Sequence, residues 1–114
     1  MNVKVACLAL LSAVVLGGPP SAAASINCGR AVKPSEKAIC ASPSLKALDA
    51  QMSSSYAKLM KALGPTAQAD SIRFEQTWWI GQRNNCGAKV ACLRNAYQTR
   101  IGELEGYRKT AAMQ

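Results

Sequence analysis

The sequence contains no histidine among its 114 residues. Histidine is the side chain that most often acts as a general base near neutral pH, and it is a frequent ligand of zinc. Its absence also removes the Ser–His and Cys–His pairs on which many hydrolases depend. We therefore expect a protein that is not an enzyme, with no catalytic residues and no metal or other cofactor.

Acidic residues are few, since 6 Asp and Glu stand against 14 Lys and Arg and give a formal net charge of +8. Such a balance favours anionic partners, for example envelope polymers, lipid head groups or acidic clefts of other proteins. The cations are scattered singly and are not interleaved with aromatic residues. A nucleic-acid partner is therefore not expected.

Long apolar runs are missing, except for one near the start. Lys4 precedes the run "VACLALLSAVVLGG", which is too short to cross a bilayer, and a small-residue cleavage pattern ends at Ala24. We interpret residues 1–24 as a signal peptide that is cleaved after Ala24. No later segment resembles a stop-transfer sequence, so we expect a periplasmic or secreted protein that does not span a membrane.

Five cysteines are present, and Cys7 belongs to the predicted signal peptide. The even number that remains in an exported domain predicts two disulfides, for which three pairings are possible. Loop-closure entropy favours near neighbours, so we predict the pairs Cys28–Cys40 and Cys86–Cys92. The spacing C-x5-C also differs from the C-x2-C of zinc sites and thioredoxin-like redox sites.

Residues 42–65 have the start and stop signals of one helix. Ser42 is a favoured N-cap, Pro43 suits the first helical position, and Gly64 with Pro65 ends the pattern. Apolar residues between them recur at spacings of three and four, as on one face of a helix: Leu45, Leu48, Met52, Tyr56, Leu59 and Leu63.

A second helix is predicted along "DSIRFEQTWWIGQRN" (70–84), with Thr66 or Asp70 as its cap. Spacings of four, three and four place four residues on one face: Ile72, Gln76, Trp79 and Arg83. Two of these side chains are polar, so this face is not a simple apolar core. Other large apolar side chains of the helix must pack elsewhere or stay partly exposed: Phe74, Trp78 and Ile80.

A third helix follows Gly87, because a narrow apolar stripe recurs at helical spacing: Val90, Leu93, Tyr97, Ile101 and Leu104. The Pro-containing segment 25–41 is predicted to be an arm with one helical turn from Ser35, whose hydroxyl would cap that turn. No alternation typical of strands stands out. The predicted fold is all-α: a small antiparallel three-helix bundle with a stapled N-terminal arm and two disulfides.

Two segments, "SEKAICASPSLKALDAQMSSSYAKL" (35–59) and "EQTWWIGQRNNCGAKVACLRNAYQTRIGEL" (75–104), resemble the LprI-like lysozyme inhibitor family, a small exported bacterial domain. The order and spacing of the matching residues carry the resemblance: Glu36, Cys40, Leu45, Leu48, Asp49, Tyr56, Gln76, Trp79, Arg83, Cys86, Cys92, Leu93, Tyr97, Arg100 and Leu104. The resemblance covers nearly all of the chain after the signal peptide. Residues 25–114 are therefore expected to form one LprI-like helical domain.

This resemblance implies an all-helical fold, disulfides placed as above, and an exported binding protein that inhibits lysozyme or another peptidoglycan hydrolase by protein–protein binding. The alternative is a non-enzymatic structural or adaptor protein of the envelope, whose cations bind anionic polymer or lipid surfaces. The naming member of the family is a lipoprotein. Here Asn27 precedes Cys28, which does not fit lipid-anchoring cleavage, so no lipid-anchoring cysteine is expected.

Seven residues of the pattern are candidates for a structural or a binding role: Asp49, Tyr56, Gln76, Trp79, Arg83, Tyr97 and Arg100. In the structural interpretation, Asp49 and Arg83 form a partly buried pair that Trp79 covers. In the binding interpretation, Arg83 reaches an acidic cleft of a partner with help from Gln76 and Tyr97. We favour the structural interpretation, because charged residues at core-facing positions usually pair within their own chain.

Contacts with a target are predicted for cations on constrained segments, because such segments lose less conformational entropy on binding. A lysozyme cleft carries two carboxylates, which an inserted Lys or Arg would neutralise. The candidates are Arg30, Lys33 and Lys37 on the arm, and Lys89 in the Cys86–Cys92 loop. Many lysozymes are themselves basic, so the long-range field of this protein would not steer it toward them.

Overall fold

A computed structural model of the protein describes residues 25–113, so the predicted signal peptide lies outside the described residues. The described part contains a short 3-10 helix and four α-helices: η1 (Cys28–Arg30), α1 (Pro34–Ala41), α2 (Pro43–Leu63), α3 (Ala67–Asn84) and α4 (Val90–Ala112). No strand occurs between residues 25 and 113. The prediction of an all-α fold is confirmed.

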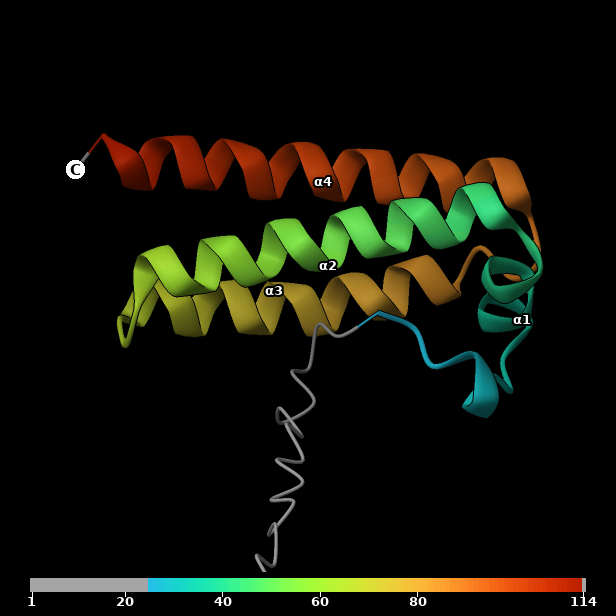
Figure 1. The fold of residues 1–114 in the computed structure, drawn as a ribbon. Coiled ribbons are helices and arrows are strands. Elements are labelled where there is room, and N and C mark those ends of the chain that lie inside the picture. The colour runs from blue at the N-terminus through green and yellow to red at the C-terminus, as the bar shows by residue number, and fades with distance from the viewer. Residues whose placement is uncertain (1–24, 114) are drawn as a thin grey trace, which may run out of the picture.

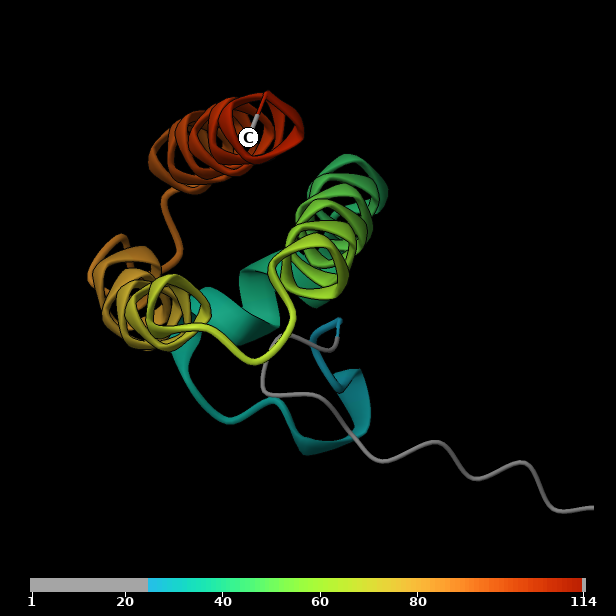
Figure 2. The ribbon, with the colours of Figure 1, turned by 90° about the vertical axis from the view of Figure 1, so that its left-hand side faces the viewer.

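The three long helices run in alternating directions, so α2 and α4 are parallel and α3 is antiparallel to both (Figure 1). Seen end on, they occupy the corners of a triangle (Figure 2). The short helix α1 lies at the end of the bundle where α3 ends and α4 begins, and it contacts all three long helices. The bundle therefore has one end that α1 covers.

The prediction of three helices is wrong, because α1 is a complete fourth helix. Its eight residues are too few to show a helical periodicity in the sequence, and its stability comes from tertiary contacts. Ile39 enters the core, and Pro34 fits the first helical position. The segment predicted as an arm thus supplies part of the core.

The predicted capping role of Ser35 is also wrong. Lys33 occupies the N-cap position of α1 without a side-chain cap. Ser35 is fully buried, and its hydroxyl donates a hydrogen bond of 2.9 Å to Oδ1 of Asn84 at the end of α3. A buried hydroxyl without a partner would be destabilising, so Ser35 hydrogen-bonds to a residue of α3 and does not cap its own helix.

The predicted ends of α2 agree with the structure, and of the two caps considered for α3 the structure has Thr66, so α3 begins at Ala67 and not after Asp70. The hydroxyl of Ser42 accepts a hydrogen bond from the amide of Leu45, and Thr66 caps α3 by accepting one from the amide of Ala69. Gly64 ends α2 at a φ of 60°, a conformation that glycine adopts without the steric penalty of a Cβ atom.

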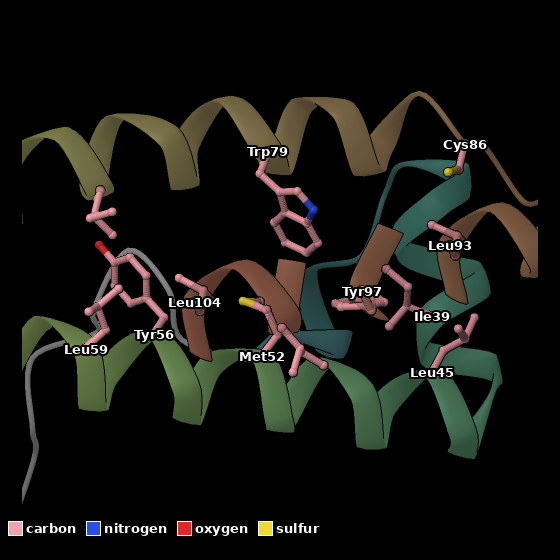
Figure 3. Packing of buried hydrophobic residues seen from close by; sticks show 12 residues of the cluster. Ile39, Leu45, Met52, Tyr56, Leu59, Trp79, Cys86, Leu93, Tyr97 and Leu104 are labelled. Carbon is pink, nitrogen blue, oxygen red and sulfur yellow. The ribbon is translucent and has the colours of Figure 1, made fainter. Parts of the chain in front are cut away.

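The core lies between the long helices and extends under α1. Its largest inward side chains come from every helix, and Figure 3 shows Trp79 reaching from α3 toward Met52 of α2. The helices α2 and α4 pack closely, whereas α3 approaches them less closely because its inward face carries long side chains such as Gln76 and Arg83. None of the helices between residues 25 and 113 is long and apolar enough to cross a membrane.

Both predicted disulfides are confirmed. Cys28–Cys40 joins η1 to the end of α1, and Cys86–Cys92 closes the loop between α3 and α4. The paired Cα atoms lie 5.6 and 5.5 Å apart, respectively. Both crosslinks therefore stabilise the end of the bundle that α1 covers.

We expect removal of either disulfide to destabilise the fold without abolishing it. The chain-entropy relation gives a loss of about 2 to 3 kcal/mol for loops of these lengths, with the larger loss for Cys28–Cys40. The paired variants Cys28→Ala/Cys40→Ala and Cys86→Ala/Cys92→Ala are compared with the oxidised protein by urea denaturation. Loss of the helical circular-dichroism signal in either variant without denaturant would contradict this expectation.

Candidate functional site

All seven candidate residues of the sequence pattern point into the bundle. None is more than 7 % exposed. They lie on the three long helices: Asp49 and Tyr56 on α2, Gln76, Trp79 and Arg83 on α3, and Tyr97 and Arg100 on α4. Their contacts form two groups, one near α1 and one nearer the middle of the bundle.

The first group is a buried polar cluster of Asp49, Arg83 and Tyr97, here called the Asp49 cluster. The hydroxyl of Tyr97 donates to Oδ1 of Asp49 at 2.9 Å. Nη1 of Arg83 donates to the same hydroxyl at 3.5 Å and lies 4.0 Å from Asp49 Oδ1. Each long helix contributes one member, so the cluster fixes the three helices relative to one another.

The Asp49 cluster also holds the N-terminal segment. The backbone amide of Ile26 donates to Oδ2 of Asp49 at 2.7 Å. Asn84 connects the cluster to α1, because its Oδ1 accepts hydrogen bonds from Arg83 and from the hydroxyl of Ser35. The sequence patterns did not identify Ile26, Ser35 or Asn84 as partners. Of these three, only Asn84 could have been identified locally, because it directly follows Arg83 in the sequence.

Trp79 covers the Asp49 cluster from the side of α3. Its ring lies edge-on to Tyr97, with centroids 5.4 Å apart, and the guanidinium carbon of Arg83 is 5.7 Å from the Trp79 centroid. The indole Nε1 donates to the carbonyl of Ala96 on α4 at 3.3 Å. These contacts place Arg83 between an aromatic ring and a carboxylate, an arrangement that compensates a buried cation.

The structure therefore brings Asp49 and Arg83 together, as the structural interpretation expected, with Tyr97 hydrogen-bonded to both. The pair is buried and not partly buried. Gln76 and Tyr97, the proposed helpers of Arg83 in partner binding, are 1 % and 0 % exposed. In this conformation, none of the three can extend into the cleft of another protein.

The electrostatic environment keeps the Tyr97 hydroxyl protonated. Burial raises the pKa of Tyr97, and the neighbouring Asp49 carboxylate raises it further, whereas Arg83 opposes the shift. The phenol therefore remains a hydrogen-bond donor to Asp49 at all pH values near neutrality.

The second group centres on Arg100 and is here called the Arg100 cluster, with Gln76, Glu75 and Glu103. Nε of Arg100 donates to Oε1 of Gln76 at 2.8 Å, and Nη1 donates to Oε2 of Glu103 at 2.9 Å. Glu75 Oε2 lies 3.6 Å from Nη1. The sequence analysis did not predict that Glu75 and Glu103 pair with Arg100. The spacing of three residues between Arg100 and Glu103 would have indicated one of these ion pairs.

Gln76 links the Arg100 cluster, which lies on α3 and α4, to α2, because its Nε2 donates a hydrogen bond to Sδ of Met52 on α2 at 3.0 Å. Tyr56 lies on the same side of α2 and is 5 % exposed, and burial raises its pKa.

Among the described residues, no group of three or more Cys, Asp or Glu is placed to hold a metal ion.

The four predicted target-contacting cations are all exposed. Arg30 lies in η1, Lys33 directly precedes α1, Lys37 lies on α1, and Lys89 directly precedes α4. Both η1 and α4 contact α1 at the end of the bundle that α1 covers, although η1 and α4 do not contact each other. The four residues together are here called the cationic end (Figure 1). None of the four forms an ion pair with any residue between 25 and 113.

We expect Asp49→Ala to lower the free energy of unfolding by about 3 to 5 kcal/mol, because it leaves the buried Arg83 without its carboxylate. The control is Asp70→Ala, since Asp70 forms a surface pair with Arg73 and its loss should cost less than about 1 kcal/mol. Urea denaturation of both variants measures the difference. Equal stability of the two variants would contradict a stabilising role for the Asp49 cluster.

We expect Tyr97→Phe to be about 1 to 3 kcal/mol less stable than the original protein at pH 7, because a buried carboxylate loses a donor. The folded pKa of Tyr97 is raised above 10.0, so above this pH the unfolded chain loses the proton first and stability falls. Phenylalanine has no such proton. The difference in unfolding free energy between the original protein and Tyr97→Phe should therefore narrow by up to about 1.4 kcal/mol per pH unit above pH 10. Urea denaturation at several pH values measures it, and a constant difference up to about pH 11.5 would contradict a raised pKa of Tyr97.

The family described as "Lysozyme inhibitor LprI" matches residues 28–106, a range that includes both disulfides and all seven buried residues of the pattern. No curated protein and no solved structure matches the chain. The family match covers most of the sequence, and the chain therefore belongs to the LprI family of lysozyme inhibitors.

Proposed function

We propose that this chain is an exported, non-enzymatic binding protein that inhibits a lysozyme by occupying the cleft of the enzyme. The observation that carries the proposal is the membership of residues 28–106 in a lysozyme inhibitor family. A shared fold does not by itself carry a shared function, so the proposal also needs a surface with suitable chemistry. The cationic end supplies one.

The cationic end has the chemistry to fill a lysozyme cleft. Such a cleft uses two carboxylates, and a Lys or Arg placed between them would pair with them and exclude the water that hydrolysis needs. Arg30 and Lys33 follow the half-cystine Cys28, and Lys89 lies inside the Cys86–Cys92 loop. These crosslinks limit the motion of the segments before binding, so less conformational entropy is lost in the complex.

The buried residues of the pattern act in this proposal as positioning residues. Asp49 holds the amide of Ile26, and Asn84 connects Arg83 with Ser35 of α1. Both contacts attach the segments that carry the cations to the long helices. The motif residues would thus affect inhibition through the shape of the cationic end and not through contact with the enzyme.

The test is the lysis of a peptidoglycan suspension by lysozymes of several types, with and without the oxidised protein, at low and moderate salt. A specific inhibitor should protect the suspension in a dose-dependent way and reach a plateau near an equimolar ratio with the enzyme. Absence of protection against every type at both salt concentrations would overturn the proposal. Salt-sensitive binding to anionic polymer or lipid without a fixed stoichiometry would then favour the envelope adaptor.

A charge-matched pair of variants tests the cationic end. The first replaces its four cations with glutamine: Arg30, Lys33, Lys37 and Lys89. The control replaces four exposed cations at the opposite end of the bundle: Lys58, Lys61, Arg108 and Lys109. Both variants lose the same formal charge, so the net charge of the protein changes equally in the two. We expect at least about a tenfold rise in the inhibitory concentration for the first variant only, which corresponds to about 1.4 kcal/mol.

Equal loss of inhibition in the two variants would assign the effect to net charge and exclude a specific cationic end. Unchanged inhibition in both would place the contact surface elsewhere on the molecule. Thermal unfolding of each variant, followed by circular dichroism, confirms that the helices remain folded.

A further inference from the structure

A groove lies between α3 and α4 on the outside of the bundle. One hollow of about 220 Å³ is lined by Glu75, Trp78, Trp79, Arg100, Glu103 and Tyr107. A second hollow of about 320 Å³ shares both tryptophans and Glu103 and continues to the Cys86–Cys92 disulfide. The two hollows together are here called the α3–α4 groove.

The groove exposes aromatic surface that the fold does not use. Trp78 lines both hollows, yet it is 62 % exposed, because the inward face of α3 is occupied by Gln76 and Trp79. The partly buried Tyr107 adds an aromatic wall from α4. A large exposed aromatic side chain in a concave site is typical of binding surfaces.

The solvent-facing charge of the groove is negative, although the protein as a whole is strongly basic. Glu75 and Glu103 have 41 % and 47 % of their side chains exposed, whereas the single cation, Arg100, is buried behind them at 2 %. Burial raises the pKa of Tyr107, and the carboxylates of Glu75 and Glu103 contribute in the same direction, as expected beside negative charge.

This combination selects one class of ligand group. Aromatic faces and carboxylates both attract ammonium and guanidinium groups, and the apolar walls suit the methylene stem of a long cationic side chain. Anionic groups would meet two carboxylates before they reached Arg100. We propose that the α3–α4 groove binds a lysine or arginine side chain that a basic protein partner presents, with its stem against Trp78 and Tyr107 and its charge beside Glu75 and Glu103.

If the proposed function holds, the α3–α4 groove and the cationic end would contact the same lysozyme. Its second hollow reaches the disulfide whose loop carries Lys89. A basic lysozyme has an acidic cleft within a cationic surface, so one such partner would contact the cationic end through its cleft and the groove through its surface. Local attraction at the groove would offset the unfavourable long-range repulsion between two basic proteins.

The test is an NMR titration of the oxidised protein, with the indole N–H signals of Trp78 and Trp79 as reporters. The probes are N-acetyl-arginine amide and N-acetyl-lysine amide, and the neutral control is N-acetyl-citrulline amide, which has nearly the shape of the arginine probe. We expect saturable shifts with both cationic probes only. Equal shifts with the citrulline probe, or stronger shifts with N-acetyl-glutamate amide, would overturn the proposal.

Matched variants separate the groove from general surface charge. The double variant Glu75→Gln/Glu103→Gln should weaken binding of the arginine probe at least about fivefold, the scale of exposed ion pairs and cation–π contacts. The control Asp70→Asn/Glu105→Gln removes two exposed carboxylates outside the groove, one on α3 and one on α4, and should change the affinity for the arginine probe less than about twofold. Equal effects of the two charge changes would overturn the proposal.

A second pair of variants keeps the test valid if the glutamates prove necessary for folding. Trp78→Ala removes the aromatic wall, and Phe74→Ala removes an exposed aromatic side chain one turn earlier that does not line the groove. Only Trp78→Ala should abolish the shift of the Trp79 signal. Retained binding in Trp78→Ala would overturn the proposal.

The titration contains no lysozyme, so its outcome is independent of inhibition. Cation binding without inhibition would support the groove and leave the proposed function without support, and inhibition without cation binding would overturn the groove alone. Binding to phosphatidylcholine vesicles with the same dependence on Glu75 and Glu103 would overturn the assignment of a protein partner.

Discussion

The buried carboxylate of Asp49 is the group on which the arrangement of the helices depends. A desolvated carboxylate is strongly destabilising unless hydrogen bonds and a counter-ion compensate it. Here Tyr97 and the amide of Ile26 donate to it, and Arg83 lies 4.0 Å away. These partners belong to α4, the N-terminal segment and α3. One charge on α2 is thus satisfied only when four segments are correctly placed.

The same polar core explains the surfaces of the molecule. Because the inward face of α3 carries long polar and aromatic side chains, α3 approaches α2 and α4 less closely than they approach each other. Hollows remain between α3 and α4, and their rim is acidic and aromatic. At the end that α1 covers, two short crosslinks hold segments that carry exposed cations. A net basic protein therefore presents surfaces of opposite charge.

The features that could be predicted from the sequence are local ones. Apolar spacing of three and four residues indicated the three long helices, and Ser42 and Gly64 marked the ends of α2 because capping depends on a few adjacent residues. Loop-closure entropy gave both disulfide pairs. The polar residues on the inward face of α3 indicated an ion pair of Arg83 with Asp49, since a charge at a core-facing position requires a partner, but the sequence predicted this pair as only partly buried.

The remaining features were decided by tertiary structure. The hydrogen bonds from Ile26 and Tyr97 to Asp49 and from Ser35 to Asn84 span 23, 48 and 49 residues, so no local spacing specifies them. The helix α1 is too short to have a readable period, and its burial depends on the other helices. The sequence by itself thus determined the long helices, the two ends of α2 and the crosslinks, which depend on neighbouring residues. The partners of the buried charges and the exposure of Trp78 depend on how the helices pack.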